Sequence, residues 1–167
     1  MNSFAYIGRN AYLTPQFFLI WGSLVIYFIL SYFITPLFAL GPYLLSVIGI
    51  LTLLDLYWLF RTSEPVSSTR SMSELLSLGY SESVTITVQN HTDLLLKIQI
   101  LDEVPFEFQI RDLHYSTSLE PNGNCNWTYH LIPKDRGTYE FGQTILLLES
   151  PLGLISRRMV TGQSSRI

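Results

Sequence analysis

The sequence predicts two transmembrane α-helices followed by an all-β, immunoglobulin-like sandwich. Two long apolar runs, 17–34 and 37–60, predict a helical hairpin in a membrane. Beyond residue 73, apolar and polar residues alternate in short segments separated by turn residues, which is typical of β-strands. Because these segments show no helical period, we expect a sandwich rather than a mixed α/β domain.

Each apolar run is long enough to cross a bilayer. A helical span needs roughly 20 apolar residues, and the two runs supply about 18 and about 24. Only Thr35 and Pro36 separate them, a connection too short to hold a domain. Both ends of the hairpin are therefore expected on one side of the membrane, residues 1–16 together with everything after residue 60.

The cations near the hairpin predict which side this is. Arg9 precedes the first run and Arg61 and Arg70 follow the second, whereas the connection between the runs has no cation. The positive-inside rule then places the soluble part in the cytoplasm, on a multi-pass protein of the plasma membrane. The rival interpretation is a cleaved secretory signal peptide, which needs a shorter apolar core and a small-residue cleavage site.

Asp55 is the one ionisable residue inside the apolar runs. A carboxylate within a membrane can mark a proton relay or an ion site, but the runs offer only hydroxyl groups as polar partners. Asp55 also stands close to Arg61, at the end of the second run. We therefore interpret Asp55, Trp58 and Arg61 as residues of the membrane–water interface.

The soluble part begins with a polar, serine-rich stretch, 61–73, which predicts a linker or an edge strand. The sandwich is expected over 74–160 and a C-terminal tail over 161–167. Strands are predicted at 83–89 and 94–102, joined as an antiparallel hairpin by a turn at 90–93, and a third strand at 106–111. Later strands are predicted at 125–132, on both sides of Gly142 between 139 and 148, and up to Val160.

A tyrosine corner supports the sandwich. The segment Asp135-Arg136-Gly137-Thr138-Tyr139 has the spacing at which a tyrosine entering a late strand bonds to upstream backbone. We expect Asp135, Gly137 and Tyr139 to be structural, with Trp127 as the core aromatic residue. Cys125 is the only cysteine, so no intramolecular disulfide can form and packing must hold the sheets together.

The composition and motifs argue against several classes of function. The net charge is -3 and the pI is near 5.5, which does not favour nucleic-acid binding. The sequence has no glycine-rich phosphate loop and no G-x-S-x-G nucleophile motif, and His91, His114 and His130 lack the close spacing of zinc ligands. We therefore predict no enzymatic activity, no cofactor and no metal site.

Four segments that follow the hairpin carry a family resemblance: SVTITVQN at 83–90, DEVP at 102–105, DRGTYEFG at 135–142 and SPLGL at 150–154. Their order and spacing resemble the amino-terminal part of the bacterial family called domain of unknown function 58, over nearly the whole chain. Members of that family carry two membrane helices, a β-sandwich and a von Willebrand A-like domain with a metal-ion-dependent adhesion site. They are commonly encoded beside MoxR-type AAA ATPases, which implies a role in assembling or maturing protein complexes.

The sequence departs from that family in its last residues. No Asp-x-Ser-x-Ser segment stands in the 167 residues, so no metal role is carried over to any residue. We expect either that the chain is a truncated form or that the A-like domain sits on a separate chain.

Together these observations predict a non-enzymatic, membrane-anchored protein-interaction module in a MoxR-associated assembly or maturation system. The expected partners are the lipid bilayer and an AAA ATPase or a von Willebrand A-like protein. The alternative is an exported, membrane-tethered sandwich for adhesion or ligand binding.

Overall fold

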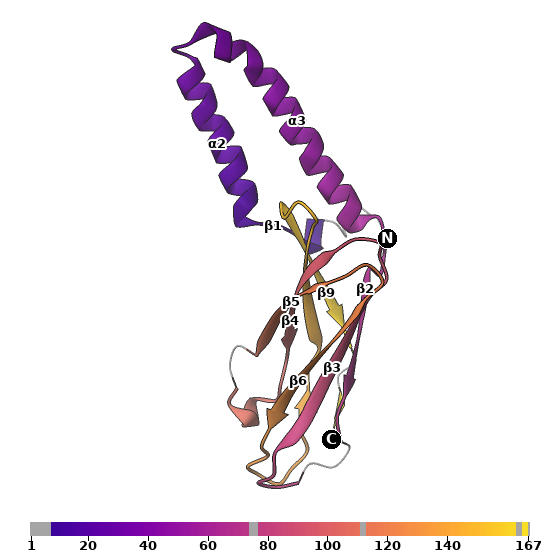
Figure 1. Cartoon of the computed structure of the whole chain (residues 1–167). Helices are drawn as coiled ribbons and strands as arrows, with labels where there is room; N and C mark the ends of the chain where they lie inside the picture. The colour runs from indigo at the N-terminus through magenta and orange to yellow at the C-terminus, as the bar shows by residue number, and fades with distance from the viewer. Residues whose placement is uncertain (1–7, 74–76, 111–112, 163–164, 167) are drawn as a thin grey trace. The chain divides into compact units, whose positions relative to one another are not determined.

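Figure 1 shows a computed structural model of the chain, which describes residues 8–73, 77–110, 113–162 and 165–166. The chain forms two compact units. The first comprises the residues up to Ser63 together with Glu149–Arg157, and the second comprises Glu64–Leu148 and the residues from Arg158 onward. Parts of the predicted N-terminal segment (1–7), sandwich (74–76 and 111–112) and tail (163–164 and 167) lie outside the described residues.

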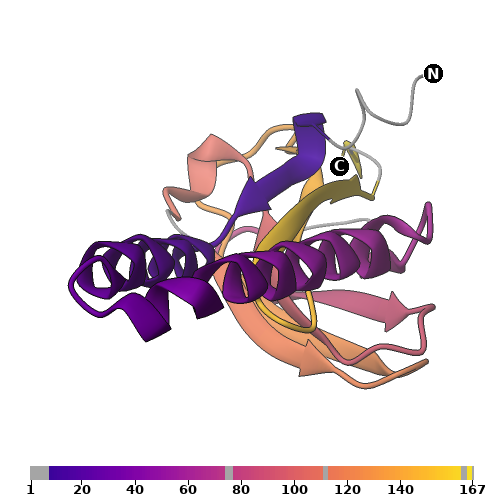
Figure 2. The same cartoon turned by 90° about the horizontal axis from the view of Figure 1, so that it is seen from above.

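The first unit is built around a helical hairpin. A short strand, β1 (Ala11–Leu13), pairs antiparallel with the start of β9 (Ile155–Thr161), with Leu13 opposite Ile155. Helix α2 (Pro15–Ser31) follows, with Thr14 as N-cap and proline in its first turn, where a missing N–H costs nothing. Helix α3 (Thr35–Phe60) completes the hairpin that Figures 1 and 2 show.

Aromatic side chains hold the two helices together near the turn. The Tyr27 hydroxyl donates a hydrogen bond of 2.6 Å to the carbonyl oxygen of Leu37. The rings of Phe28 and Phe38 meet edge to face, with centroids 6.4 Å apart. Gly41 leaves room for the Phe28 ring, which a Cβ at residue 41 would overlap. The two helices on either side of the short connection therefore pack against each other as an antiparallel pair.

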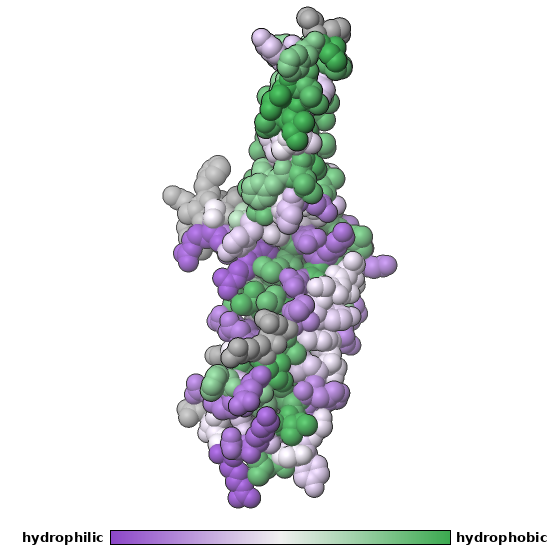
Figure 3. Space-filling model, turned by 90° about the vertical axis from the view of Figure 1, so that its left-hand side faces the viewer, coloured by the Kyte–Doolittle hydropathy of each residue, from purple (hydrophilic) through white to green (hydrophobic). Residues whose placement is uncertain are grey.

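One of the two helices meets the length and composition of a membrane span. Leu37–Phe60 in α3 has 24 residues, a mean hydropathy of 2.2 and little buried surface. Helix α2 is apolar but has 17 residues, because the chain leaves the helix at Tyr32, before the end of the predicted run at residue 34. Among the described residues, one helix rather than the predicted two thus qualifies by length. Hydrophobic residues cover the hairpin in Figure 3.

The second unit is a β-sandwich of two antiparallel sheets. One sheet has the order β2-β3-β6, formed by Val66–Ser71, Glu82–Asn90 and Asn124–Leu131. The other is a five-stranded sheet of order β1-β9-β8-β4-β5, in which β8 is Thr144–Glu149, β4 is Leu96–Asp102 and β5 is His114–Leu119. Two short strands, β7 (Glu140–Phe141) and β10 (Ser165–Arg166), pair with each other.

Alternating side chains from both sheets form the core. Each of these residues is nearly or fully buried, and burying a Val, Leu or Ile side chain contributes roughly 1.5–3 kcal/mol. The set includes Val84, Ile86, Val88, Ile98, Ile100, Leu119, Leu131, Leu146 and Leu148. The period-2 pattern that predicted strands at 83–89 and 125–132 thus marks the buried face correctly.

Two sequence predictions about the sandwich are wrong. The segments 83–89 and 94–102 do not form a hairpin, because β3 pairs with β2 and β6, whereas β4 pairs with β5 and β8 in the other sheet. The predicted third strand at 106–111 is instead a 3₁₀ helix, Phe106–Phe108, after which Gln109 has a left-handed backbone with φ 55°. Residues 66–71, within the predicted linker or edge strand, form the edge strand β2.

The Asn90 side chain explains the crossing between the sheets. It is buried, and its amide nitrogen donates to the carbonyl oxygens of Leu94 and Glu120, both at 2.9 Å. Its amide oxygen accepts from the backbone N–H and the hydroxyl of Thr92. Asn90 therefore holds the β3–β4 connection against the β5–β6 connection, with all of these polar groups paired.

Candidate functional site

The described residues contain no cluster of His, Cys, Asp and Glu side chains arranged to hold a metal ion. Two polar arrangements stand out instead. The first, which we call the helix clamp, consists of Thr14, Asp55, Ser150 and Arg157 in the first unit. The second, which we call the core network, consists of Arg70, Asp102, Tyr129 and Thr144 in the second unit.

Asp55 is the centre of the helix clamp. It lies on α3, is fully buried, and accepts three hydrogen bonds from the turn after β8. The donors are the Ser150 hydroxyl at 2.5 Å and the backbone N–H groups of Leu152 and Leu154 at 3.1 and 3.2 Å. Both carboxyl oxygens therefore meet protein donors, as buried polar groups generally do.

Thr14 joins the start of α2 to the same turn. Its hydroxyl lies 2.5 Å from the carbonyl oxygen of Gly153 and 3.0 Å from that of Leu154, and its backbone N–H donates to Leu154. Gly153 has a φ of +71°, a left-handed conformation that favours glycine, and a Cβ there would also meet the Gln16 side chain. Both helices of the hairpin are thus bound to one short turn.

Arg157 completes the clamp at the end of α3. Its buried guanidinium donates to the carbonyl oxygens of Leu59, Thr62 and Ser63 at 3.0, 2.8 and 2.6 Å. It also lies over the Phe60 ring, 4.9 Å from the centroid. The last carbonyl groups of a helix lack hydrogen-bond donors within the helix and carry partial negative charge. A guanidinium group at this position supplies both the donors and the compensating positive charge.

The structure places the three predicted interface residues on the last turns of α3 and just beyond it. Asp55 is buried in the clamp, Trp58 is 38% exposed, and Arg61 is exposed at the C-cap. Their position at a membrane surface stays a prediction. The partners of Asp55 could not be found from sequence, because Ser150 lies 95 residues away along the chain.

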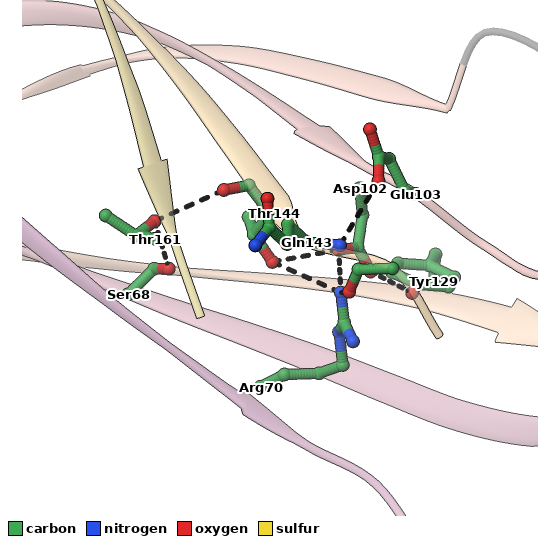
Figure 4. A network of polar contacts seen from close by, with 9 residues as sticks. Ser68, Arg70, Asp102, Glu103, Tyr129, Gln143, Thr144 and Thr161 are labelled. Atoms are coloured by element: carbon green, nitrogen blue, oxygen red, sulfur yellow. Dashed lines mark hydrogen bonds and ion pairs between the residues drawn. The ribbon is translucent and has the colours of Figure 1, made fainter. Parts of the chain in front are cut away.

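Figure 4 shows the core network, which joins strands of both sheets. Asp102, at the end of β4, forms an ion pair with Arg70 of β2 and accepts hydrogen bonds from Tyr129 of β6 at 2.5 Å and Thr144 of β8 at 2.9 Å. Arg70 also donates to the carbonyl oxygen of Gly142 at 3.0 Å and lies over the Phe141 ring.

This arrangement is suited to holding the two sheets in one register. A buried ion pair gains little over apolar packing, but removing one partner leaves a charge that is costly to bury, by about 3–5 kcal/mol. Both Asp102 oxygens already meet protein donors, and the residue is 6% exposed. The network therefore links β2, β4, β6 and β8, strands of both sheets, through one carboxylate.

Two groups in the second unit have shifted acidities. Burial raises the pKa of the Tyr129 hydroxyl, and the hydrogen bond to the Asp102 carboxylate and its negative charge raise it further, far above the usual range. Burial also raises the pKa of the Cys125 thiol. Cys125 is therefore protonated at neutral pH and is not in the reactive thiolate form.

The Tyr139 side chain makes the contact expected of a tyrosine corner. Its hydroxyl donates to the carbonyl oxygen of Asp135, four residues upstream, at 2.6 Å. Its ring packs against Phe108, with centroids 4.8 Å apart. Gly137 lies between Asp135 and Tyr139 in the sequence, and a Cβ added at Gly137 would meet no atom within 4 Å.

Trp127 is not the core aromatic residue that the sequence predicted. It is partly buried, whereas Tyr129 on the same side of β6 is buried. Since β6 is an edge strand, its inward side chains reach the border of the sandwich as well as its centre. Trp127 stacks there on Tyr115 of β5, with rings 5.7 Å apart and 9° from parallel.

Comparisons with known proteins give fold similarity at low levels only. No family model matches the chain, and no curated protein matches it. The CARDB domain of the PF1109 protein from Pyrococcus furiosus, solved with di-metal ions, is 8% identical with a TM-score of 0.41, covering 58% of this chain and 87% of that domain. The structural genomics target SoR45 is 14% identical with a TM-score of 0.39, covering 61% and 83%.

A β-glucosidase from Listeria innocua, solved with glucose, is 14% identical with a TM-score of 0.29, and the match covers 59% of this chain and 16% of the glycosidase. None of these three similarities reaches a TM-score of 0.5, so the fold described above rests on the strand pairing of the chain itself.

Replacing Asp55 by alanine should open the turn that the clamp holds. The change removes an acceptor of three hydrogen bonds, and hydrogen bonds to charged groups contribute about 1.5–3 kcal/mol each. We expect hydrogen exchange in the 150–155 segment to accelerate at least about tenfold in detergent micelles, measured by mass spectrometry. Thr52→Ala is the matched control, because the Thr52 hydroxyl bonds only to its own helix. Equal exchange in both variants would refute the clamp.

Replacing Tyr129 by phenylalanine should flatten the loss of stability at high pH. The folded state keeps the Tyr129 proton, whereas the unfolded state releases it above about pH 10, so folding stability falls as pH rises beyond that value by about 1.4 kcal/mol per unit. Denaturant unfolding between pH 9 and 11 measures this slope. Tyr80→Phe, at a position 71% exposed, should retain the wild-type slope. Parallel slopes for Tyr129→Phe and wild type would contradict the assignment.

Proposed function

We propose that the chain is a non-enzymatic, membrane-anchored protein-interaction module. The observation that carries this proposal is the apolar surface of the hairpin. No Asp, Glu, Lys or Arg occurs between Arg9 and Asp55, and large apolar side chains on both helices are exposed, such as Leu19 at 72% and Leu53 at 65%. Such a surface is unfavourable in water by about 25 cal/mol per Å² and costs nothing in lipid.

We propose further that both helices cross the membrane. Helix α2 has 17 residues and spans about 25 Å, slightly less than a hydrocarbon core of about 30 Å. The apolar residues of the turn extend that reach, and Tyr32 and Phe33 are both about 80% exposed, as suits side chains in the headgroup layer. In this proposal the turn lies in the far interface and the clamp lies at the near one.

The near interface is proposed to be cytoplasmic. Arg9 and Arg61 flank the hairpin at its open end, and both are exposed. The turn between the helices contains no charged residue. This asymmetry supports a plasma-membrane protein whose soluble domain faces the cytoplasm.

The sandwich is proposed to be immunoglobulin-like. One sheet has three strands and the other has five, and the chain crosses between the sheets after β3, after β5 and after β6, as in Greek-key sandwiches of this class. The tyrosine corner before β8 supports the same topology. An exposed strand edge or loop of such a sandwich can bind a partner through main-chain hydrogen bonds, which requires no pocket.

The proposed partner is a MoxR-type AAA ATPase or a von Willebrand A-like protein. The support is the order of sequence motifs that resembles the domain-of-unknown-function-58 family. One surface of the second unit offers apolar contacts to such a protein: Leu78, Tyr80 and Ile132 are exposed on two loops that the Gly79 N–H to Pro133 carbonyl bond joins at 2.9 Å. We call these three residues the loop patch.

Reporter fusions test the anchor and its orientation. A fluorescent protein active only in the cytoplasm, fused after Ile167, should be active and remain with carbonate-washed bacterial membranes. Val47→Arg, in the middle of α3, should reduce the membrane fraction, because arginine costs about 3 kcal/mol at a helix centre, whereas Tyr80→Arg should not. Activity of an alkaline phosphatase fusion instead would favour the exported alternative, and a soluble fusion would refute the anchor.

Capture experiments test the partner class. The detergent-solubilised chain should retain a purified MoxR-type ATPase or a von Willebrand A-like protein on an affinity column. Replacing Tyr80 and Ile132 by aspartate should weaken capture at least about tenfold, since charges are disfavoured in the apolar centre of an interface. Leu95→Asp, an exposed position outside the loop patch, is the control. Failure of active partners of both kinds to bind would reject this part of the proposal.

A further inference from the structure

The β8–β9 turn, residues 150–154, has its backbone donors paired within the protein. The N–H groups of residues 150, 153 and 155 donate to oxygen atoms of residues 150–155. The N–H groups of Leu152 and Leu154 donate to the Asp55 carboxyl group, and Pro151 has no N–H. Backbone that leaves water must find its partners in the protein, and every N–H from residue 150 to residue 155 meets that condition.

Apolar side chains are exposed beside this turn. Leu152, in the middle of the turn, is 42% exposed. Leu13 is 50% exposed and lies on β1 opposite Ile155, which directly follows the turn. Residues 10–54 and 150–156 contain no charged side chain. The uncharged, apolar surface of the hairpin therefore continues onto the end of β1 and the β8–β9 turn, all within the first unit.

The length of α2 sets the depth of the turn. Helix α2 has 17 residues and spans about 25 Å, whereas the hydrocarbon core is about 30 Å thick. The remaining distance of about 5 Å needs two extended residues of about 3.3 Å each, which are Thr14 and Leu13 when the connection between the helices lies in the far interface. Since Thr14 binds the carbonyl oxygens of Gly153 and Leu154, the turn lies at the same depth.

The length of α3 gives the same depth independently. A span of about 20 residues counted from Thr35 ends at Leu54, next to the Asp55 that holds the turn. Beyond it, Tyr57 and Trp58 are exposed, and such amphipathic rings favour the headgroup layer. Tilting the hairpin moves the core boundary further toward the turn, because a tilted helix spans less of the bilayer.

We propose that the β8–β9 turn lies in the lipid headgroup layer beside the near end of the hairpin, with the side chains of Leu13 and Leu152 in contact with acyl chains. The partner of this surface is the phospholipid bilayer. The inference rests on the proposed function, because it requires both helices to cross the membrane. It goes beyond that function, since a strand and a turn of the sheet contact lipid as well as the helices.

Thiol accessibility tests the depth of both leucines. Leu152→Cys and Leu13→Cys, each in a Cys125→Ser background and in nanodiscs of phosphatidylcholine and phosphatidylglycerol, should react with a charged, membrane-impermeant thiol reagent. We expect rates at least about tenfold below that of an equally exposed cysteine in water, because the reactive thiolate is disfavoured in lipid. Both faces of a nanodisc are open to the reagent, so the result does not depend on the orientation of the chain.

Two further cysteines calibrate the rates. Val160→Cys is the matched control, because Val160 is 48% exposed and stands on the same strand, five residues or about 17 Å beyond Ile155. It should react as a cysteine in water. Leu53→Cys, on the exposed surface of α3, is the reference for a side chain in lipid and should be protected. Circular dichroism verifies that each variant is folded.

Spin labels on the same cysteines distinguish lipid from protein as the cause of protection. A nitroxide at position 152 or 13 should collide more often with oxygen, which concentrates in lipid, than with a water-soluble nickel chelate, and the order should reverse at position 160. Protection at 152 and 13 with nickel collisions as frequent as at 160 would overturn the inference.

The outcomes separate this inference from the proposed function. Reaction of Leu152→Cys or Leu13→Cys as fast as that of Val160→Cys, with Leu53→Cys protected, overturns the inference and leaves the anchor intact. Reaction of Leu53→Cys as fast as that of Val160→Cys refutes the anchor, and the inference falls with it. Protection at positions 53, 13 and 152, with rapid reaction at position 160, supports both.

Discussion

Asp55 binds a turn whose residues lie about 95 positions further along the chain, and the first unit depends on that contact. The turn at 150–154 presents the Ser150 hydroxyl and the Leu154 N–H, which would otherwise be buried without acceptors at a cost of about 1–3 kcal/mol each, together with the part-buried N–H of Leu152. In the position that Asp55 holds, the turn presents the carbonyl oxygens of Gly153 and Leu154 to the Thr14 hydroxyl at the start of α2. The two ends of the hairpin are thereby fixed by hydrogen bonds rather than by apolar contact alone.

In the second unit a different aspartate, Asp102, also joins segments that are distant in the sequence. Asp102 meets donors from three other strands, and each donor is itself held by the core around it. Apolar burial is not directional, whereas hydrogen bonds to one carboxylate require donors at particular positions. In both units a buried carboxylate therefore joins segments that lie far apart in the sequence.

The sequence predicted those features that depend on neighbouring residues. The alternation of Val84, Ile86 and Val88 marks the buried face of β3, and the spacing from Asp135 to Tyr139 fits the hydroxyl–backbone contact. It could not predict that β3 and β4 lie in different sheets, because alternation is the same for a hairpin and for a crossing. The Ser- and Thr-rich strand β5 gave no alternating pattern at all. The contacts of Asp55 and Arg157 link distant segments and have no local signal.

The separation along the chain also orders events during synthesis. The hairpin leaves the ribosome first, and Asp55 and the carbonyl groups at the end of α3 have no clamp partners until residues 150–157 have been translated. The hydrogen bonds that fix the two ends of the hairpin therefore form only after strands β2 to β8 have been synthesised, so that folding of the first unit is coupled to synthesis of most of the second.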